Sequence, residues 1–198
     1  MGAARNAAQG AVHWSATFLG GRPRRLADLR WQQRRGASHE LWLVIVDASA
    51  STRRHQALTD AKGVLAQVFD DAYHQRARLA LLTASGARPV WQRHGLKASA
   101  ALQPWLAALG AGGGTPLLAA LSEAVVWLER RRRLFPDEVQ RCLLMTDGRL
   151  KAFAGLAPLE CPTLLLDMEK GPIRLGRARE LAALLGAEYR HMDELAVR

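Results

Sequence analysis

The chain has 198 residues, with 28 lysines and arginines against 18 acidic residues, which gives a formal net charge of +10. Its length suits one domain with a short appendage, and a hydrophobic content of 49% excludes wholesale disorder. The longest strongly apolar run, residues 41–46, is far shorter than the roughly 18 residues that a membrane helix needs. Only two cysteines occur, without a CxxC motif, which excludes a disulfide scaffold and a zinc ribbon. We therefore expect a reduced, cytoplasmic protein with no membrane segment.

Residues 1–40 are rich in glycine, alanine and arginine. We predict a loosely ordered N-terminal arm here, in which residues 26–31 form a short helical or extended clip onto the domain. The arm has Asp28 as its single acid up to residue 39, but it lacks the apolar segment of a secretory signal. A regular pattern begins at residue 41, so the predicted domain covers residues 41–198.

From residue 41, strand and helix patterns alternate. Short continuous apolar runs are typical of strands buried on both faces, and apolar residues at helical spacing indicate amphipathic helices. In chain order, we predict a strand at 41–46, a helix at 54–69, strands at 79–82 and 89–91, helices at 98–109 and 116–133, strands at 142–145 and 162–166, a helix at 173–185 and a short strand near Glu188 and Tyr189. This alternation predicts a doubly wound α/β fold, with a mostly parallel sheet covered by helices on both faces.

Polar residues follow several of these predicted strands. Asp47, Ser49 and Ser51 come directly after the first strand, Thr115 follows a glycine-rich loop, and Asp147 follows a later strand. Because the carboxyl ends of neighbouring parallel strands meet at one edge of a sheet, these five side chains are expected to converge. Carboxylate and hydroxyl oxygens are the ligands that hard cations prefer. The sequence therefore predicts a Mg²⁺ or Mn²⁺ site.

Each fragment of this pattern also has a purely structural interpretation. The Asp-x-Ser-x-Ser segment and Thr115 can act as helix N-caps, and Asp147 with Gly148 can form a simple turn. The metal hypothesis depends on the three signals occurring together, each after the expected element.

Together these motifs resemble the metal-ion-dependent adhesion site, or MIDAS, of von Willebrand factor A (VWA, integrin I-like) domains. Within that class, the sequence is most similar to the C-terminal domain of the D component of magnesium chelatase and to cobaltochelatase-type adaptors, over about residues 13–197. The segments that carry the resemblance are 28–31, 41–51, 112–117, 146–149, 166–169, 173–176, 184–187 and 193–195. The chain departs from the family pattern at Ala50, Ser51 and Thr52, where members often have Gly-Ser-Met, but no ligand oxygen is lost.

The resemblance implies a non-catalytic adaptor that works with a separate AAA+ ATPase and a large chelatase subunit to insert a metal into a tetrapyrrole. In this interpretation the bound Mg²⁺ is a recognition device, because a partner's Asp or Glu completes its coordination shell. Arg53, Arg54 and Arg149, near the strand ends, are expected to attract the same acidic group. Family members normally carry an AAA+-type domain before this one, and no Walker A motif occurs here.

Two other functions remain open from the sequence, and a third, catalysis, is disfavoured. The chain can be an adaptor of another AAA+ chaperone that activates a metalloenzyme. Catalysis by the chain alone is not expected, because neither Ser49 nor Ser51 lies in a G-x-S-x-G motif or near a suitable histidine. Nucleic-acid binding through arginines is the alternative from a different class, although the arginine clusters are scattered and lack interleaved aromatics.

Overall fold

The computed structural model describes residues 11–12, 14–23, 25–32, 40–48, 57–97, 116–150, 155–170 and 174–195. The chain divides into two compact units, Met1–Ala37 and Ser38–Arg198, and each is described separately. The predicted helix at 98–109 lies outside the described residues.

The first unit contains two short antiparallel strands, β1 (Ala11–Val12) and β2 (Trp31–Gln32). Between them lie helix α2 (Trp14–Leu19) and a single 3₁₀ turn, η1 (Leu26–Asp28). The Oγ1 of buried Thr17 accepts a hydrogen bond of 3.0 Å from the backbone N–H of Arg30, which joins α2 to the segment before β2. The residues of the predicted clip thus form a 3₁₀ turn that leads into a strand.

The second unit is built on a six-stranded sheet with the order β5-β4-β3-β6-β7-β8. Every neighbouring pair is parallel except the antiparallel hairpin of β4 and β5. The strands are β3 (Glu40–Asp47), β4 (Arg78–Ser85), β5 (Arg88–Lys97), β6 (Val139–Thr146), β7 (Thr163–Asp167) and β8 (Glu188–His191). The predicted mostly parallel sheet is confirmed.

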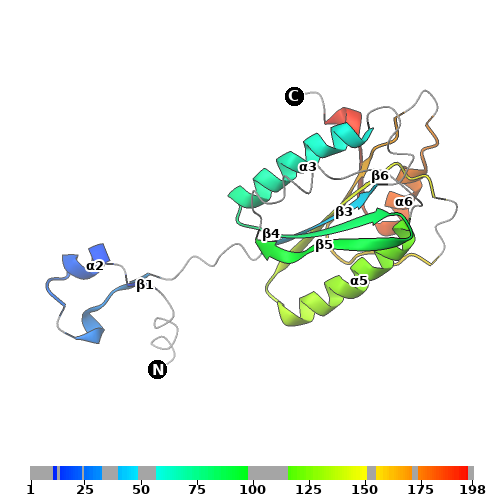
Figure 1. Cartoon of the computed structure of the whole chain (residues 1–198). Helices are drawn as coiled ribbons and strands as arrows, with labels where there is room; N and C mark the ends of the chain where they lie inside the picture. Colours follow the sequence, from blue (N-terminus) through cyan, green and yellow to red (C-terminus); the bar gives the residue numbers. More distant parts are fainter. Residues whose placement is uncertain are drawn as a thin grey trace. The chain divides into compact units, whose positions relative to one another are not determined.

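Helices cover both faces of this sheet (Figure 1). Alternate side chains of β3 enter two separate cores: Leu43 and Ile45 pack in the core that contains α5 (Leu117–Leu134) and α6 (Arg177–Leu185). Val44 and Val46 pack in the core that contains α3 (Ala57–His74). The predicted doubly wound α/β fold is therefore confirmed.

The topology changes direction between β3 and β6. From β3 the chain passes through α3 to β4 and β5 on one side, and it returns through α5 to place β6 on the other side of β3. In open α/β sheets, ligands bind at the carboxyl ends of the strands at such a switch point. The fold thus places the ends of β3 and β6 at the position where a site is expected.

Several elements differ in their bounds from the sequence prediction. Helix α3 continues to His74 instead of ending at 69, and β6 begins at Val139 instead of 142. Strand β5 runs to Lys97, well beyond the predicted residues 89–91, and two register shifts interrupt its pairing with β4. Helix α6 begins at Arg177 instead of 173, because Gly176 adopts a left-handed conformation (φ 68°) that cannot continue a helix. No helix in the described ranges is both long enough and apolar enough to cross a bilayer.

Candidate metal centre

The first carboxylate of the predicted site, Asp47, ends β3 and is completely buried. Its Oδ2 accepts a hydrogen bond of 2.8 Å from the hydroxyl of Thr146, the last residue of β6. The same Thr146 oxygen accepts a hydrogen bond of 3.0 Å from the backbone N–H of Gly148. Because Thr146 is held from both sides, it fixes the orientation of Asp47 at the switch point.

The second carboxylate, Asp147, directly follows β6 and is 5% exposed. Gly148 next to it has φ +66°, and a Cβ at this position would lie 2.4 Å from the backbone nitrogen of Ala178 in α6. Only glycine fits here, since any side chain would overlap the helix backbone. The turn that carries Asp147 is therefore packed directly against the first turn of α6.

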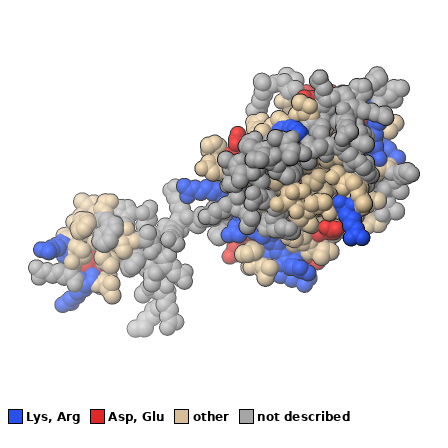
Figure 2. Space-filling model, in the orientation of Figure 1, with Lys and Arg blue, Asp and Glu red and all other residues tan. Residues whose placement is uncertain are grey.

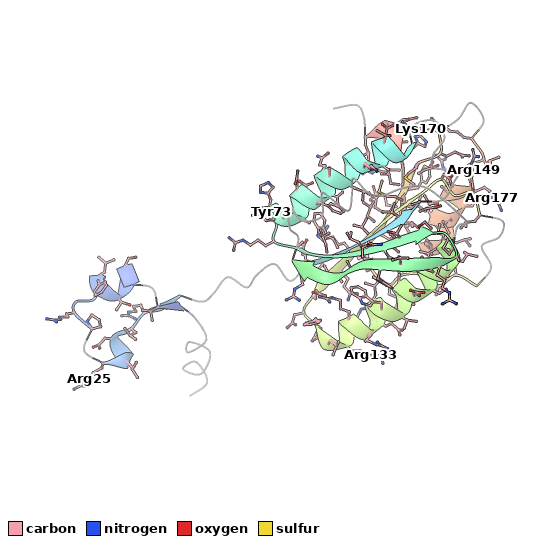
Figure 3. All side chains as sticks on the ribbon, in the orientation of Figure 1. Arg25, Tyr73, Arg133, Arg149, Lys170 and Arg177 are labelled. Atoms are coloured by element: carbon pink, nitrogen blue, oxygen red, sulfur yellow. The ribbon has the colours of Figure 1, made fainter. Side chains whose placement is uncertain are left out.

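Arg149 lies against two carboxylates of its own chain. Its backbone N–H donates to Asp147 Oδ1 at 3.1 Å, and its side-chain Nε lies 3.9 Å from Asp147 Oδ2. Its Nη2 lies 3.6 Å from Oε1 of Glu169. Figure 3 shows Arg149 at the end of the sheet beside α6. The sequence predicted this residue as a partner contact but did not predict its internal acidic neighbours.

Glu169, two residues beyond β7, is a buried acid that the sequence analysis did not assign to the site. Its Oε2 accepts hydrogen bonds from the backbone N–H groups of Leu175 and Gly176, at 2.8 and 3.2 Å. Its Oε1 has no hydrogen-bond partner among the described residues. An acid shortly after a predicted strand was the signal that identified Asp47 and Asp147, and the same signal could have identified Glu169.

Asp167, at the end of β7, already has two hydrogen-bond donors. Its Oδ2 accepts from the hydroxyl of Tyr189 at 2.8 Å, and its Oδ1 accepts from the backbone N–H of Glu169 at 2.8 Å. Burial, with the hydrogen bond to Asp167, raises the pKa of Tyr189 to about 12. Asp167 therefore ties β7 to β8, and we leave it out of the candidate metal set.

The structure thus brings Asp47 and Asp147 to the same edge of the sheet, on adjacent strands. The other predicted residues, the ligands Ser49, Ser51 and Thr115 and the partner contacts Arg53 and Arg54, lie outside the described residues. Within the described ranges, no three His, Cys, Asp or Glu side chains form a group that could hold a metal ion.

The donors that the structure does place here fit a hard cation. They are two buried carboxylates and the Thr146 hydroxyl, all of them oxygen atoms. Magnesium and manganese prefer such donors, and a buried carboxylate is stabilised by a nearby cation. The edge can therefore accept a divalent ion by the chemistry of its donors.

Comparison with curated proteins gives one distant relative, and no family model matches the chain. The uncharacterized protein Rv2850c of Mycobacterium tuberculosis is 28% identical over 190 residues, which cover 85% of this chain. The match spans only 28% of that protein's length, so most of the relative has no counterpart in this chain.

Solved structures with the same fold include three VWA-type proteins. Manganese-loaded TRAP of Plasmodium vivax has a TM-score of 0.59 at 18% identity and covers 79% of this chain and 69% of its own. The VWA domain of SpRpn10 has a TM-score of 0.52 at 12% identity, with coverages of 79% and 93%. Mussel byssus proximal thread matrix protein 1, with a zinc-occupied MIDAS motif, has a TM-score of 0.54 at 16% identity, with coverages of 81% and 43%. The second unit has the VWA fold.

Proposed function

We propose that the second unit is a metal-dependent protein-interaction module. The observation that carries this proposal is the placement of Asp47, whose buried carboxylate is fixed by Thr146 at the switch point of the sheet. Asp147, directly after the neighbouring strand, supplies a second acid in a turn that packs closely against α6. Fixed, buried acids at this edge favour recognition of a cation over a purely structural role.

The ion is Mg²⁺ or Mn²⁺, held by Asp47 and Asp147 together with Ser49, Ser51 and Thr115. When bound, the cation supplies a coordination position that a carboxylate from a partner protein can fill. One protein with the same fold is described as manganese-loaded, and another as having a MIDAS motif occupied by zinc. Both descriptions support a divalent ion. Arg149 and, by sequence position, Arg53 and Arg54 add attraction for an acidic group.

The partner that we propose is a separate AAA+ ATPase, within a magnesium- or cobalt-chelatase-like system that also has a large chelatase subunit. The sequence resemblance supports this choice, and an adaptor of another AAA+ chaperone is the alternative within the same class. The chain itself is non-catalytic in this proposal, and its contribution is to recognise the partner.

Nucleic-acid binding is the alternative from a different class. Such binding needs a continuous positive surface that follows the phosphate backbone. In Figure 2, the coloured part of the second unit shows Lys and Arg side chains interspersed with acidic and uncharged residues. Several are also paired with acids, including Arg131 with Glu138 and Arg132 with Glu160. These pairs favour a protein partner over a nucleic acid.

Calorimetry with Mg²⁺ and Mn²⁺ tests the metal site directly. The Asp47→Asn variant keeps an oxygen that can accept from Thr146 but removes the charge, so it should fold and lose metal binding. Asp137→Ala, an exposed aspartate in the turn before the opposite end of β6, is the matched control and should bind as the parent does. Equal binding by Asp47→Asn and the parent would exclude the proposed metal site.

A binding assay with the cognate AAA+ subunit then tests the partner. Binding should be lost in EDTA, recover with Mg²⁺ and be weak for Asp47→Asn. A duplex DNA should bind weakly under the same conditions. DNA binding that persists in EDTA and falls steeply with salt, together with no response of the AAA+ subunit to EDTA, would favour the nucleic-acid alternative.

A further inference from the structure

Arg149 occupies an unusual position between two acids that are almost completely buried. The Asp147 and Glu169 side chains are 6% and 1% exposed, whereas that of Arg149 is 35% exposed. The closest approaches of its guanidinium to the two carboxylates, 3.9 and 3.6 Å, are too long for hydrogen bonds, although its backbone N–H donates to Asp147. The guanidinium is therefore held by charge, and its N–H donors are not used on either carboxylate.

We propose that Arg149, positioned by Glu169, is a built-in counter-charge that keeps the affinity of the metal site low until an acidic partner engages the guanidinium. This inference rests on the proposed function of the same site and adds a means of regulating it. Arg149 is permanently charged, because its guanidinium does not lose a proton in proteins. A divalent ion on Asp147 and the arginine beside Asp147 repel each other, and burial limits the screening of that repulsion.

Glu169 explains why the guanidinium stays in place. Its Oε2 is anchored by the N–H groups of Leu175 and Gly176, so the carboxylate cannot rotate toward solvent without losing both bonds. Its backbone is also anchored, because the N–H donates to Asp167 and the carbonyl contacts His191 Nε2 at 3.0 Å. The remaining oxygen, Oε1, lacks a hydrogen bond among the described residues, and Arg149 is the charge that compensates it. Glu169 is thus a positioning residue that acts through Arg149.

The arrangement gives Arg149 two opposed effects on binding. Without a partner, its positive charge lowers the affinity of the site for a cation bound to Asp147. With an acidic partner, the N–H donors that bind neither Asp147 nor Glu169 can bind a carboxylate in the bidentate manner that arginine favours. Metal and acidic partner should then bind cooperatively, because the partner's negative charge neutralises the repulsion.

Titration with Mg²⁺ alone tests the inference without any knowledge of the partner. Arg149→Ala should bind Mg²⁺ roughly tenfold more tightly than the parent at low ionic strength, and the difference should shrink in high salt. Arg149→Lys keeps the charge and should stay within about threefold of the parent. The control is Arg133→Ala, an exposed arginine in the last turn of α5, which should leave the affinity unchanged.

A double-mutant cycle tests the positioning role of Glu169. The effect of Glu169→Gln on Mg²⁺ affinity should differ between the parent and the Arg149→Ala background, because in the parent the substitution also releases the guanidinium. Additive effects would overturn this role. If the parent binds Mg²⁺ but Arg149→Ala binds it equally or more weakly, the proposed role of Arg149 in lowering the affinity is overturned, and the proposed metal site is not. If the parent binds no Mg²⁺, the proposed function itself fails.

Discussion

The hydroxyl of Thr146 donates to Asp47 Oδ2 at 2.8 Å, which joins the ends of β3 and β6 across 99 residues of sequence. Both residues are completely buried, so neither can replace the bond with water. The bond lies both in the core and at the candidate metal site. Its loss can therefore be tested by the stability of the fold and by metal binding.

Thr146→Val should destabilise the protein and weaken metal binding together. Valine has nearly the same shape, but it leaves the buried Asp47 oxygen and the Gly148 N–H without their shared partner. The loss should be about 1–3 kcal/mol in urea unfolding. Thr146→Ser keeps the hydroxyl and should retain most of the metal affinity by calorimetry. A Thr146→Val protein that binds Mg²⁺ like the parent would show that Asp47 is oriented without this bond.

Among the glycines that the structure describes, Gly148 should be the one at which alanine is most disruptive. The new Cβ would overlap the backbone of Ala178 at 2.4 Å, so α6 or the Asp147 turn must shift. Gly155→Ala is the matched control, since Gly155 also has positive φ but no atom lies within 4 Å of the place that its new Cβ would take. The control should cost about 1–2 kcal/mol in unfolding free energy. Equal losses for the two variants would mean that the contact with α6 is unimportant.

Among the ion pairs of the described residues, that of Arg131 and Glu138 should be the most costly to break. Glu138 binds both Nε and Nη2 of Arg131, the latter at 2.8 Å, and both side chains are at least nine-tenths buried. Glu138→Ala leaves a buried guanidinium without its anion, which should cost about 3 kcal/mol in urea unfolding. Glu129→Ala, which removes an exposed partner 3.9 Å from Arg133, should cost less than about 0.5 kcal/mol. A small loss for Glu138→Ala would mean that the Trp127 and Phe135 rings, which contact Arg131, stabilise it sufficiently alone.

Tyr189 should keep its proton well above the pH at which a free tyrosine ionises. Burial and the hydrogen bond to Asp167 raise its pKa from 10.0 to about 12. Because the folded state holds this proton more tightly than the unfolded state, the stabilisation is complete below pH 10 and is lost as the pH rises toward 12. Absorbance titration of phenolate should show a step near pH 12 that is missing in Tyr189→Phe. A phenolate step for Tyr189 with its midpoint near pH 10, the value of an ordinary tyrosine, would contradict this assignment.

The sheet was predictable from sequence because its central strands are apolar on both faces. The side chains of residues 41–46 are divided between the two cores, so every position of the run is apolar. The polar atom in these side chains is the indole nitrogen of the half-buried Trp42, which donates to Glu40. Strand β5 was underestimated because it lies at the edge of the sheet and includes arginines, a histidine and a glycine. Its register shifts also break the alternation by which a half-exposed strand is recognised.

The site was predictable only in part. Asp47 and Asp147 follow strands whose apolar runs are evident, so their positions follow from the fold. The contact of Arg149 with Glu169 depends on the order of β6 and β7 and on the path of the chain into α6, which no local pattern specifies. The start of α6 depends on the left-handed Gly176, which is a local signal, and also on tertiary contacts, since Glu169 binds the N–H groups of Leu175 and Gly176 just before it.

The strand order also has a consequence for the protein as it is synthesised. Strand β6 inserts beside β3 only after α3, β4, β5 and α5 have been made, so Asp47 cannot pair with Thr146 until the ribosome has translated 99 further residues. A nascent chain that stops before β6 leaves one edge of β3 without its neighbour and Asp47 without the Thr146 hydroxyl. Recruitment of a partner through this edge would therefore select for chains whose translation has passed β6, and it would exclude prematurely terminated ones.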